Sequence, residues 1–128
     1  MSGKAPELPP VVRATCHCGA AVLELSIPGE LQSLRRCNCS FCRRRGAVAA
    51  SMLLADLRVV RGETLTLYTW GTHAARHWFC SVCGIYTHHQ RRSKPEEYGF
   101  NVACIDGVDP SELGEIPWVD GVNHPRDR

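Results

Sequence analysis

The chain lacks any long apolar segment. No part of its 128 residues approaches the ~18 consecutive apolar residues that a membrane-spanning helix requires. The first ten residues contain no apolar run of the kind found in secretory signals. These absences argue against a membrane protein and predict a cytoplasmic one.

A strong charge of one sign is also absent. The chain has 15 basic and 13 acidic residues, and its formal net charge of +2 is too small by itself to predict nucleic-acid binding. Its 44% hydrophobic and 22% charged residues are typical of globular proteins, and its length fits one domain. We expect a flexible N-terminal arm at residues 1–10 and a single zinc-binding domain at residues 11–128.

Short strands should dominate this domain. Only residues 109–113 favour a helix, with Asp109 as N-cap and Pro110 at the first position. Two of the candidate strands flank Arg61-Gly62-Glu63 and predict a β-hairpin. The segments with strand-like apolar or alternating patterns are residues 11–15, 21–27, 47–54, 57–60, 64–70, 85–90 and 98–105. The sequence therefore predicts an all-β, strand-dominated fold.

The eight cysteines are the most informative residues. In a chain without a secretory signal we do not expect them to form disulfides, because the cytosol keeps thiols reduced. Seven of them form three clusters, namely Cys16 and Cys18, then Cys37, Cys39 and Cys42, then Cys80 and Cys83. The clusters favour zinc over iron–sulfur centres, because no iron–sulfur spacing is matched. Cys104 remains, and its apolar surroundings predict a buried, inert thiol.

The number of clustered cysteines predicts two zinc ions per chain. Four thiolates close one structural site, and the remaining three leave a zinc with an open fourth position, as reactive sites have. The spacing does not settle which pairs join. A four-thiolate site that leaves three cysteines over can be formed by joining Cys16 and Cys18 to Cys80 and Cys83. It can equally be formed by joining the first pair to Cys37 and Cys39.

Three segments resemble the signatures of the glutathione-dependent formaldehyde-activating enzyme family, which also includes centromere protein V. These segments are residues 16–19, 37–47 and 79–84, and they occur in the family's order. Residues 101–107 and 120–123 are similar to the family's closing segments, so the resemblance covers about residues 11–123.

The resemblance implies a β-tent of packed antiparallel sheets and resolves the pairing. It implies that the structural zinc is bound by Cys16, Cys18, Cys80 and Cys83, and the catalytic zinc by Cys37, Cys39 and Cys42. It also implies a carbon–sulfur lyase that acts as an S-hydroxymethylglutathione synthase, joining glutathione to formaldehyde.

Five arginines without an intervening acidic residue surround the middle cluster. We expect Arg43 and Arg44 to bind the carboxylates of glutathione through paired hydrogen bonds. The same basic cluster, Arg35, Arg36, Arg43, Arg44 and Arg45, is also compatible with phosphate backbones. The alternative to an enzyme is therefore a zinc-stabilised binding module for nucleic acid or a protein partner. We assign no metal to the histidines, although His88 or His89 near an open zinc could serve as a general acid or base.

Overall fold

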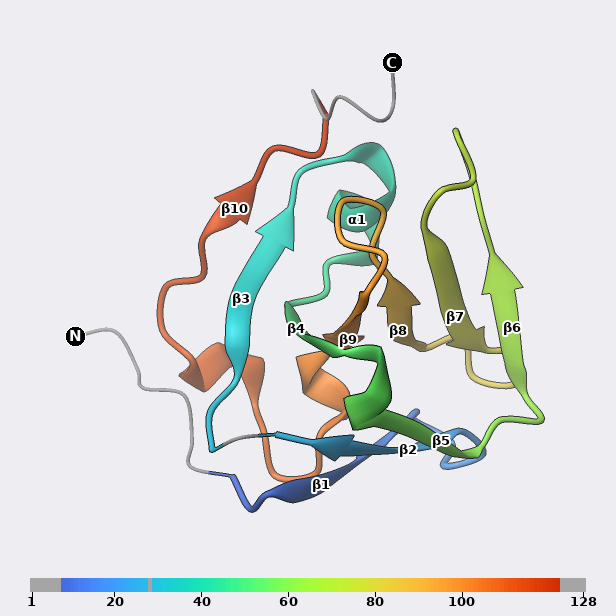
Figure 1. Cartoon of the computed structure of the whole chain (residues 1–128), viewed down its shortest axis with the longest axis vertical. Helices are drawn as coiled ribbons and strands as arrows, with labels where there is room; N and C mark the ends of the chain where they lie inside the picture. The colour runs from blue at the N-terminus through green and yellow to red at the C-terminus, as the bar shows by residue number, and fades with distance from the viewer. Residues whose placement is uncertain (1–7, 28, 123–128) are drawn as a thin grey trace.

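The computed structural model describes residues 8–27 and 29–122, and in them strands predominate (Figure 1). The strands are β1 (Val11–Thr15), β2 (Val22–Ser26), β3 (Gln32–Cys37), β4 (Ala49–Leu53), β5 (Leu57–Arg61), β6 (Leu65–Tyr68), β7 (Arg76–Cys80), β8 (Tyr86–Gln90), β9 (Glu97–Asn101) and β10 (Trp118–Val119). The helices are α1 (Ser40–Arg45) and the 3-10 helices η1 (Leu54–Asp56), η2 (Val102–Cys104) and η3 (Pro110–Glu112). The predicted strand-dominated fold is confirmed.

The strands form two sheets. The smaller has the order β1-β2-β5, and the larger has the order β10-β3-β4-β9-β8-β7-β6. In Figure 1 the smaller sheet lies across the base, and the strands of the larger sheet stand above it. This arrangement agrees with the expected β-tent. One described pairing departs from the expected antiparallel order, because β10 runs parallel to β3.

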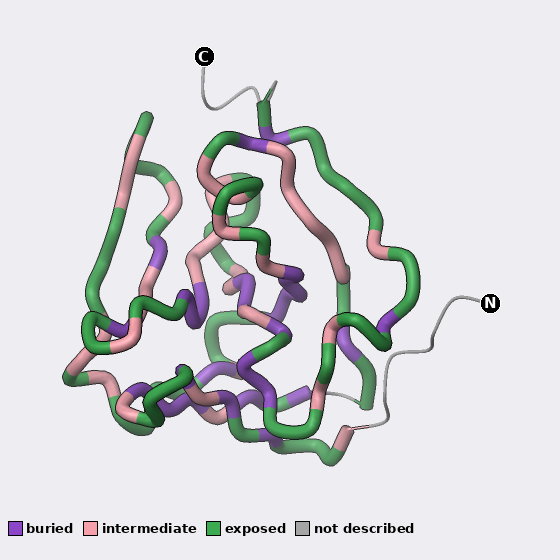
Figure 2. The backbone as a smooth tube through the Cα atoms, turned by 180° about the vertical axis from the view of Figure 1, so that it is seen from behind, coloured by how far each residue is buried: buried purple, intermediate pink, exposed green. Residues whose placement is uncertain are grey.

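The main core lies between the two sheets. Leu23 and Leu25 of β2 are almost completely buried and belong to the same apolar cluster as Ala50 of β4 and Phe100 of β9. Figure 2 shows the buried residues gathered where the strands of the two sheets approach each other. Removal of these side chains from water supplies the main driving force that holds one sheet on the other.

The predicted hairpin of residues 57–60 and 64–70 is wrong. β5 pairs with β2 in the smaller sheet, whereas β6 pairs with β7 in the larger. The chain crosses from one sheet to the other near Gly62, where a Cβ would lie 2.7 Å from Val59 Cγ1.

Local turn signals do not decide which strands pair. Burial decides it, because pairing with Leu25 places Leu57 in the core.

Several elements escape prediction because they lack an apolar pattern. β3 carries mostly polar and basic residues, none of them buried, and no residue of α1 is buried. The predicted strand at residues 98–105 ends at Asn101, and Cys104 lies instead in η2, buried as expected. The helical start at Asp109 is confirmed, since its Oδ1 accepts from the Ser111 N–H at 2.9 Å, although the helix is a 3-10 turn.

Parts of the predicted arm and domain lie outside the described residues. These parts are residues 1–7 of the arm and residues 123–128 of the domain. The described end of the arm contacts the domain, because the Ile27 N–H donates to the Pro10 carbonyl at 2.8 Å and Leu8 packs against the core. Within residues 8–27 and 29–122, no helix has the length and apolar character needed to cross a membrane.

His88 is a titratable ring buried in the larger sheet. It is 3% exposed, and its ring stacks on Trp78 with the centroids 4.7 Å apart. Loss of hydration lowers the pKa of His88 to about 4, whereas in an unfolded chain the ring titrates near ~6.5. The ring is therefore neutral in the folded protein at neutral pH.

We expect this pKa difference to destabilise the folded protein in acid. The unfolded chain binds the proton first, so the stability contributed by the neutral ring is present above about pH 6.5 and is lost as the pH falls towards about 4. Between about pH 7.5 and pH 5 the wild type should lose about 2 kcal/mol more unfolding free energy than His88→Phe, which keeps a flat ring against Trp78. Urea unfolding at both pH values measures this, with zinc content followed in parallel. Equal losses in the two proteins would contradict it.

Candidate metal centres and adjoining cavities

Four thiols meet where two tight turns approach each other. Cys16 and Cys18 lie in the turn between β1 and β2, and Cys80 and Cys83 lie at the turn between β7 and β8. The four Sγ atoms all lie within 4.8 Å of one another. This grouping is the one that the family resemblance implies, and it connects a hairpin of the smaller sheet to a hairpin of the larger.

The sulfur spacing fits a tetrahedral zinc ion. Cys18 Sγ lies 3.6 Å from Cys16 Sγ and 3.7 Å from Cys80 Sγ. A tetrahedron with Zn–S bonds of ~2.3 Å has edges of about 3.8 Å. The Ala21 N–H donates to Cys16 Sγ at 3.3 Å, as expected for a thiolate acceptor. A hydrogen bond with the Thr64 hydroxyl lowers the pKa of Cys80 to about 6. These four residues therefore have the geometry of a closed zinc site.

The other three clustered cysteines meet at the junction of β3 and α1. Cys37 ends β3, Cys39 is the N-cap of α1, and Cys42 lies in its first turn, with all three Sγ atoms within 4.8 Å of one another. Hydrogen bonding from Cys42 lowers the pKa of Cys37 to about 5 and raises that of Cys42. In the described part of the chain, no fourth cysteine, histidine or carboxylate joins this group.

The segment after β10 packs directly on the three-cysteine cluster. The Oδ1 atom of Asn38 accepts from the Gly121 N–H at 2.7 Å and from the Val122 N–H at 3.2 Å. A Cβ on Gly121 would overlap Cys37 Sγ and would lie 3.0 Å from Cys39 Cβ. Glycine is therefore required for this close approach, and the segment covers one side of the cluster.

A cavity of about 200 Å³ lies beside the three cysteines, and we call it the thiolate cavity. The residues that line it include one carboxylate, that of Asp120, and four arginines, namely Arg35, Arg45, Arg91 and Arg92. Arg91 is paired with Glu97 at 2.6 Å, and Arg35 donates to Ser51 Oγ at 2.7 Å. Burial and the nearby Arg91 lower the pKa of Arg35. The residues that line the cavity therefore carry an excess of positive charge beside the three cysteines.

Arg43 and Arg44, the arginines predicted to bind substrate, do not line the thiolate cavity. Both are exposed on α1. Arg44 Nη1 donates to the carbonyl and the Oγ of Ser40, at 3.1 and 2.6 Å, and its side chain lines a neighbouring cavity. Contact of these two residues with a substrate stays a prediction. From the same basic cluster, Arg35 and Arg45 are the members beside the thiols.

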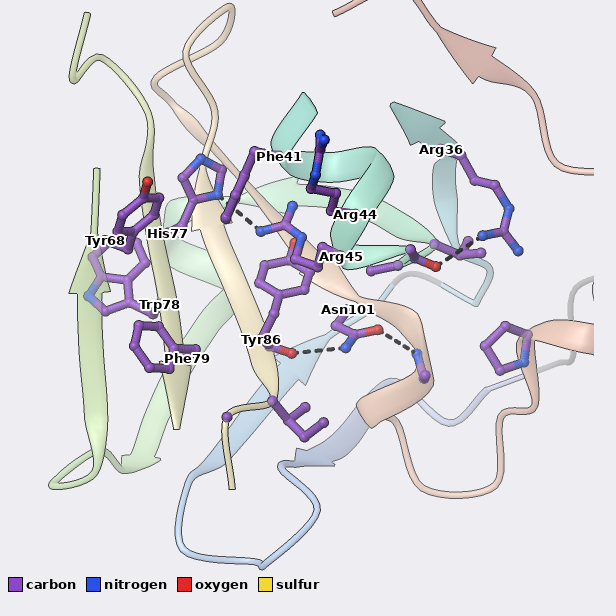
Figure 3. A pocket seen from close by; sticks show the side chains of 17 residues that line it. Arg36, Phe41, Arg44, Arg45, Tyr68, His77, Trp78, Phe79, Tyr86 and Asn101 are labelled. Atoms are coloured by element: carbon purple, nitrogen blue, oxygen red, sulfur yellow. Dashed lines mark hydrogen bonds between the residues drawn. The ribbon is translucent and has the colours of Figure 1, made fainter. Parts of the chain in front are cut away.

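The neighbouring cavity is larger, at about 680 Å³, and we call it the aromatic cavity (Figure 3). Its ring-bearing walls come from α1 and from three adjacent strands of the larger sheet, with the rings of Phe41, Tyr68, Trp78, Phe79 and Tyr86. Arg45, Ala47 and His77 line both cavities, so they form the wall between them.

Arg45 is the central residue of this wall. Its guanidinium carbon lies 4.7 Å from the ring centre of Phe41 and 3.6 Å from that of Tyr86. Its Nη1 lies 3.2 Å from His77 Nδ1, and its Nη2 donates to Cys42 Sγ at 3.5 Å. Its Nε is buried and has no hydrogen-bond partner in the described part of the chain. Arg45 thus connects the aromatic cavity to a thiol of the cluster.

His77 contributes a neutral ring to this wall. Burial lowers its pKa to about 3, and the positive charge of Arg45 acts in the same direction. Because a guanidinium only donates, the Nδ1 of His77 accepts from Arg45, and the ring proton lies on Nε2. His77 stacks on His89 at 5.2 Å, and both line the thiolate cavity, whereas His88 does not.

Sequence reasoning missed Arg91, Arg92, His77 and Gly121 as residues of the site. The adjacent pair Arg91-Arg92, a second basic group in a polar loop, was the available signal for two of them. Nothing in the sequence pattern pointed to His77. Gly121 lies in a segment that resembles the family's closing signature, but its contact with Cys37 depends on the fold.

Two comparisons with known proteins identify proteins to which this chain is similar. A solved crystal structure of a protein from Rhodobacter sphaeroides is similar to the chain, with a TM-score of 0.80 and 63% sequence identity, and the match covers 84% of this chain and 99% of that one. The sequence model of the family described as glutathione-dependent formaldehyde-activating enzyme matches residues 11–116. Because this match spans both thiol clusters and every described strand except β10, the chain belongs to the family of glutathione-dependent formaldehyde-activating enzymes.

Proposed function

We propose that the chain is a zinc-dependent carbon–sulfur lyase-type enzyme that forms or splits an adduct of glutathione with formaldehyde or a related small aldehyde. Family membership supports these reactants. The observation that carries the proposal is the unequal number of thiols in the two clusters, four in one and three in the other. Four thiolates complete a tetrahedral zinc, whereas three leave one position for a ligand. Only the three-thiol cluster lines the thiolate cavity.

The size of the thiolate cavity supports a small aldehyde. Its volume of about 200 Å³ is below the ~300–1,000 Å³ of sites that enclose a whole ligand of drug size. It suits the thiol end of glutathione and a one-carbon partner, with the rest of the tripeptide outside. A zinc ion held by Cys37, Cys39 and Cys42 would offer a position to the glutathione sulfur and lower the pKa of its thiol below ~8.5.

The chain's own residues would orient the reactants and handle the proton. The thiolate sulfur attacks the carbonyl carbon, the C=O electron pair moves to oxygen, and the oxygen takes up one proton; the reverse step splits the C–S bond. Arg35 and Arg92 supply cations for a glutathione carboxylate. The Nε2–H of His77 is a hydrogen-bond donor for the oxygen. The Gly121 segment limits access of water from its side.

The proposal predicts that glutathione binds at the three-thiol cluster through its sulfur. In the cobalt-substituted protein, glutathione should change the visible absorption through sulfur-to-metal charge transfer. S-methylglutathione, which lacks a free thiol, should not. Cys42→Ser should abolish the response, while Cys104→Ser, which changes a buried thiol outside both clusters, should retain it. A wild-type spectrum that ignores saturating glutathione, together with salt-sensitive binding of oligonucleotides, would favour the binding module instead.

A further inference from the structure

The aromatic cavity has the dimensions of a small-molecule site, and it shares only Arg45, Ala47 and His77 with the cavity of the proposed reaction. Its volume of about 680 Å³ falls within the ~300–1,000 Å³ range of ligand pockets. Its rings come from separate elements, with Phe41 on α1, Tyr68 on β6 and Tyr86 on β8. Aromatic walls of this kind favour a flat, apolar ligand that can stack on them.

One side of the aromatic cavity is cationic. Arg36, Arg44 and Arg45 line it, and among the described residues that line it there is no aspartate or glutamate. Arg36 donates from Nη1 to the Gly46 carbonyl at 3.0 Å, and Arg44 donates from Nη1 to Ser40. Figure 3 shows Arg45 above the ring of Tyr86 and Arg44 beside α1, with Arg36 apart from them on the other side of α1. Guanidiniums held in this way are suited to bind a carboxylate, because each has five N–H donors.

The Nε of Arg45 is a buried donor that has no hydrogen-bond partner in the described part of the chain. A buried donor without a partner is unfavourable and uncommon in folded proteins. The other two nitrogens of this guanidinium already contact His77 and Cys42. The Nε is buried, so a ligand in the cavity does not reach it, and the ligand's charge must be bound by another arginine of the wall.

We propose that the aromatic cavity binds a small organic anion with a flat apolar body, such as an aromatic carboxylate. The apolar body lies against the rings of Phe41 and Tyr86, and the carboxylate is held by Arg44. This ligand class is distinct from the thiol and the small aldehyde of the proposed reaction.

Calorimetric titration of the full chain with 2-naphthoate tests this proposal. We expect a submillimolar Kd, and at least tenfold weaker binding of the neutral isostere 2-naphthamide, which lacks the charge that the arginines recognise. Ala103→Trp should abolish binding, because Ala103 is an exposed residue of η2 that lines the cavity. Ala55→Trp is the matched control, since Ala55 is an exposed alanine of η1 that lines no described cavity.

A charge substitution provides a second, independent test. Arg44→Gln should weaken naphthoate binding about tenfold, while Arg43→Gln, its exposed neighbour outside the cavity wall, should leave it unchanged. Absence of binding at millimolar naphthoate, equal affinity for the amide, or binding that survives Ala103→Trp would each overturn the proposal. The assay requires neither thiol nor aldehyde, so its failure is distinguishable from failure of the cobalt experiment.

Discussion

Replacing Cys80 with serine should unfold the protein, whereas replacing Cys42 with serine should leave it folded with about one zinc fewer. Cys80 is completely buried and belongs to the cluster that connects the two sheets. A structural four-thiolate zinc contributes on the order of 10 kcal/mol to folding, comparable with the ~5–15 kcal/mol total stability of a typical domain. Cys42 lies in the first turn of the short helix α1. Its cluster joins only β3 and α1, so it does not connect the two sheets.

Zinc per chain by plasma emission spectrometry, and the unfolding transition in urea, measure the two effects. The wild type should contain two zinc ions, and Cys16→Ser should behave like Cys80→Ser. Cys104→Ser is the control, because this buried thiol lies outside both clusters and its replacement should retain both ions. A wild type with one zinc would count against two metal sites, and a Cys80→Ser protein as stable as the wild type would count against a structural four-thiolate site.

Gly121→Ala should selectively weaken metal binding at the three-thiol cluster. The added Cβ would overlap Cys37 Sγ, so either the thiol or the C-terminal segment must move. Overpacking of this kind costs about 1–3 kcal/mol, and displacement of the segment would also break its hydrogen bonds to Asn38. We expect at least a tenfold loss of zinc affinity at this cluster, the equivalent of about 1.4 kcal/mol.

Competition with a coloured chelator separates the two zinc ions and measures this loss. The tightly held ion of the four-thiol cluster should be unaffected in Gly121→Ala. Val122→Ala serves as the matched control, because its side chain is 61% exposed and its backbone can keep the bond to Asn38. If Gly121→Ala releases zinc no more readily than Val122→Ala, the close packing of this segment does not support the metal site.

The parts of the site that sequence reasoning predicted are those formed by local turns. Cys16 and Cys18, like Cys80 and Cys83, are close in sequence and occupy single turns, so their proximity did not depend on the rest of the fold. Which turns join to form a four-cysteine site depends on how the two sheets pack together. The spacing of the cysteines alone did not decide this pairing. It was the resemblance to a family that pointed to the grouping found in the structure.

The residues around the metal site were harder to predict because they come from distant strands. His77 reaches the thiolate cavity from β7, and Arg92 reaches it from the loop after β8. No periodicity in the sequence connects either residue to Cys37. The basic cluster around α1 indicated that arginines would matter. It did not indicate which arginines would face the thiols. A six-residue helix without buried residues has no apolar stripe that would show which side faces the protein.

The four-thiol cluster also imposes an order of events on folding. Each of its two halves belongs to a single turn, yet Cys18 and Cys80 are separated by 62 positions. Hairpins form within about 1–10 μs, whereas folds dominated by distant strand pairings take roughly milliseconds to seconds. Each turn should therefore hold its own two sulfurs in place long before the second turn reaches it. The lifetime of such a half-built site is set by how quickly the two sheets dock, and not by how quickly metal diffuses to it.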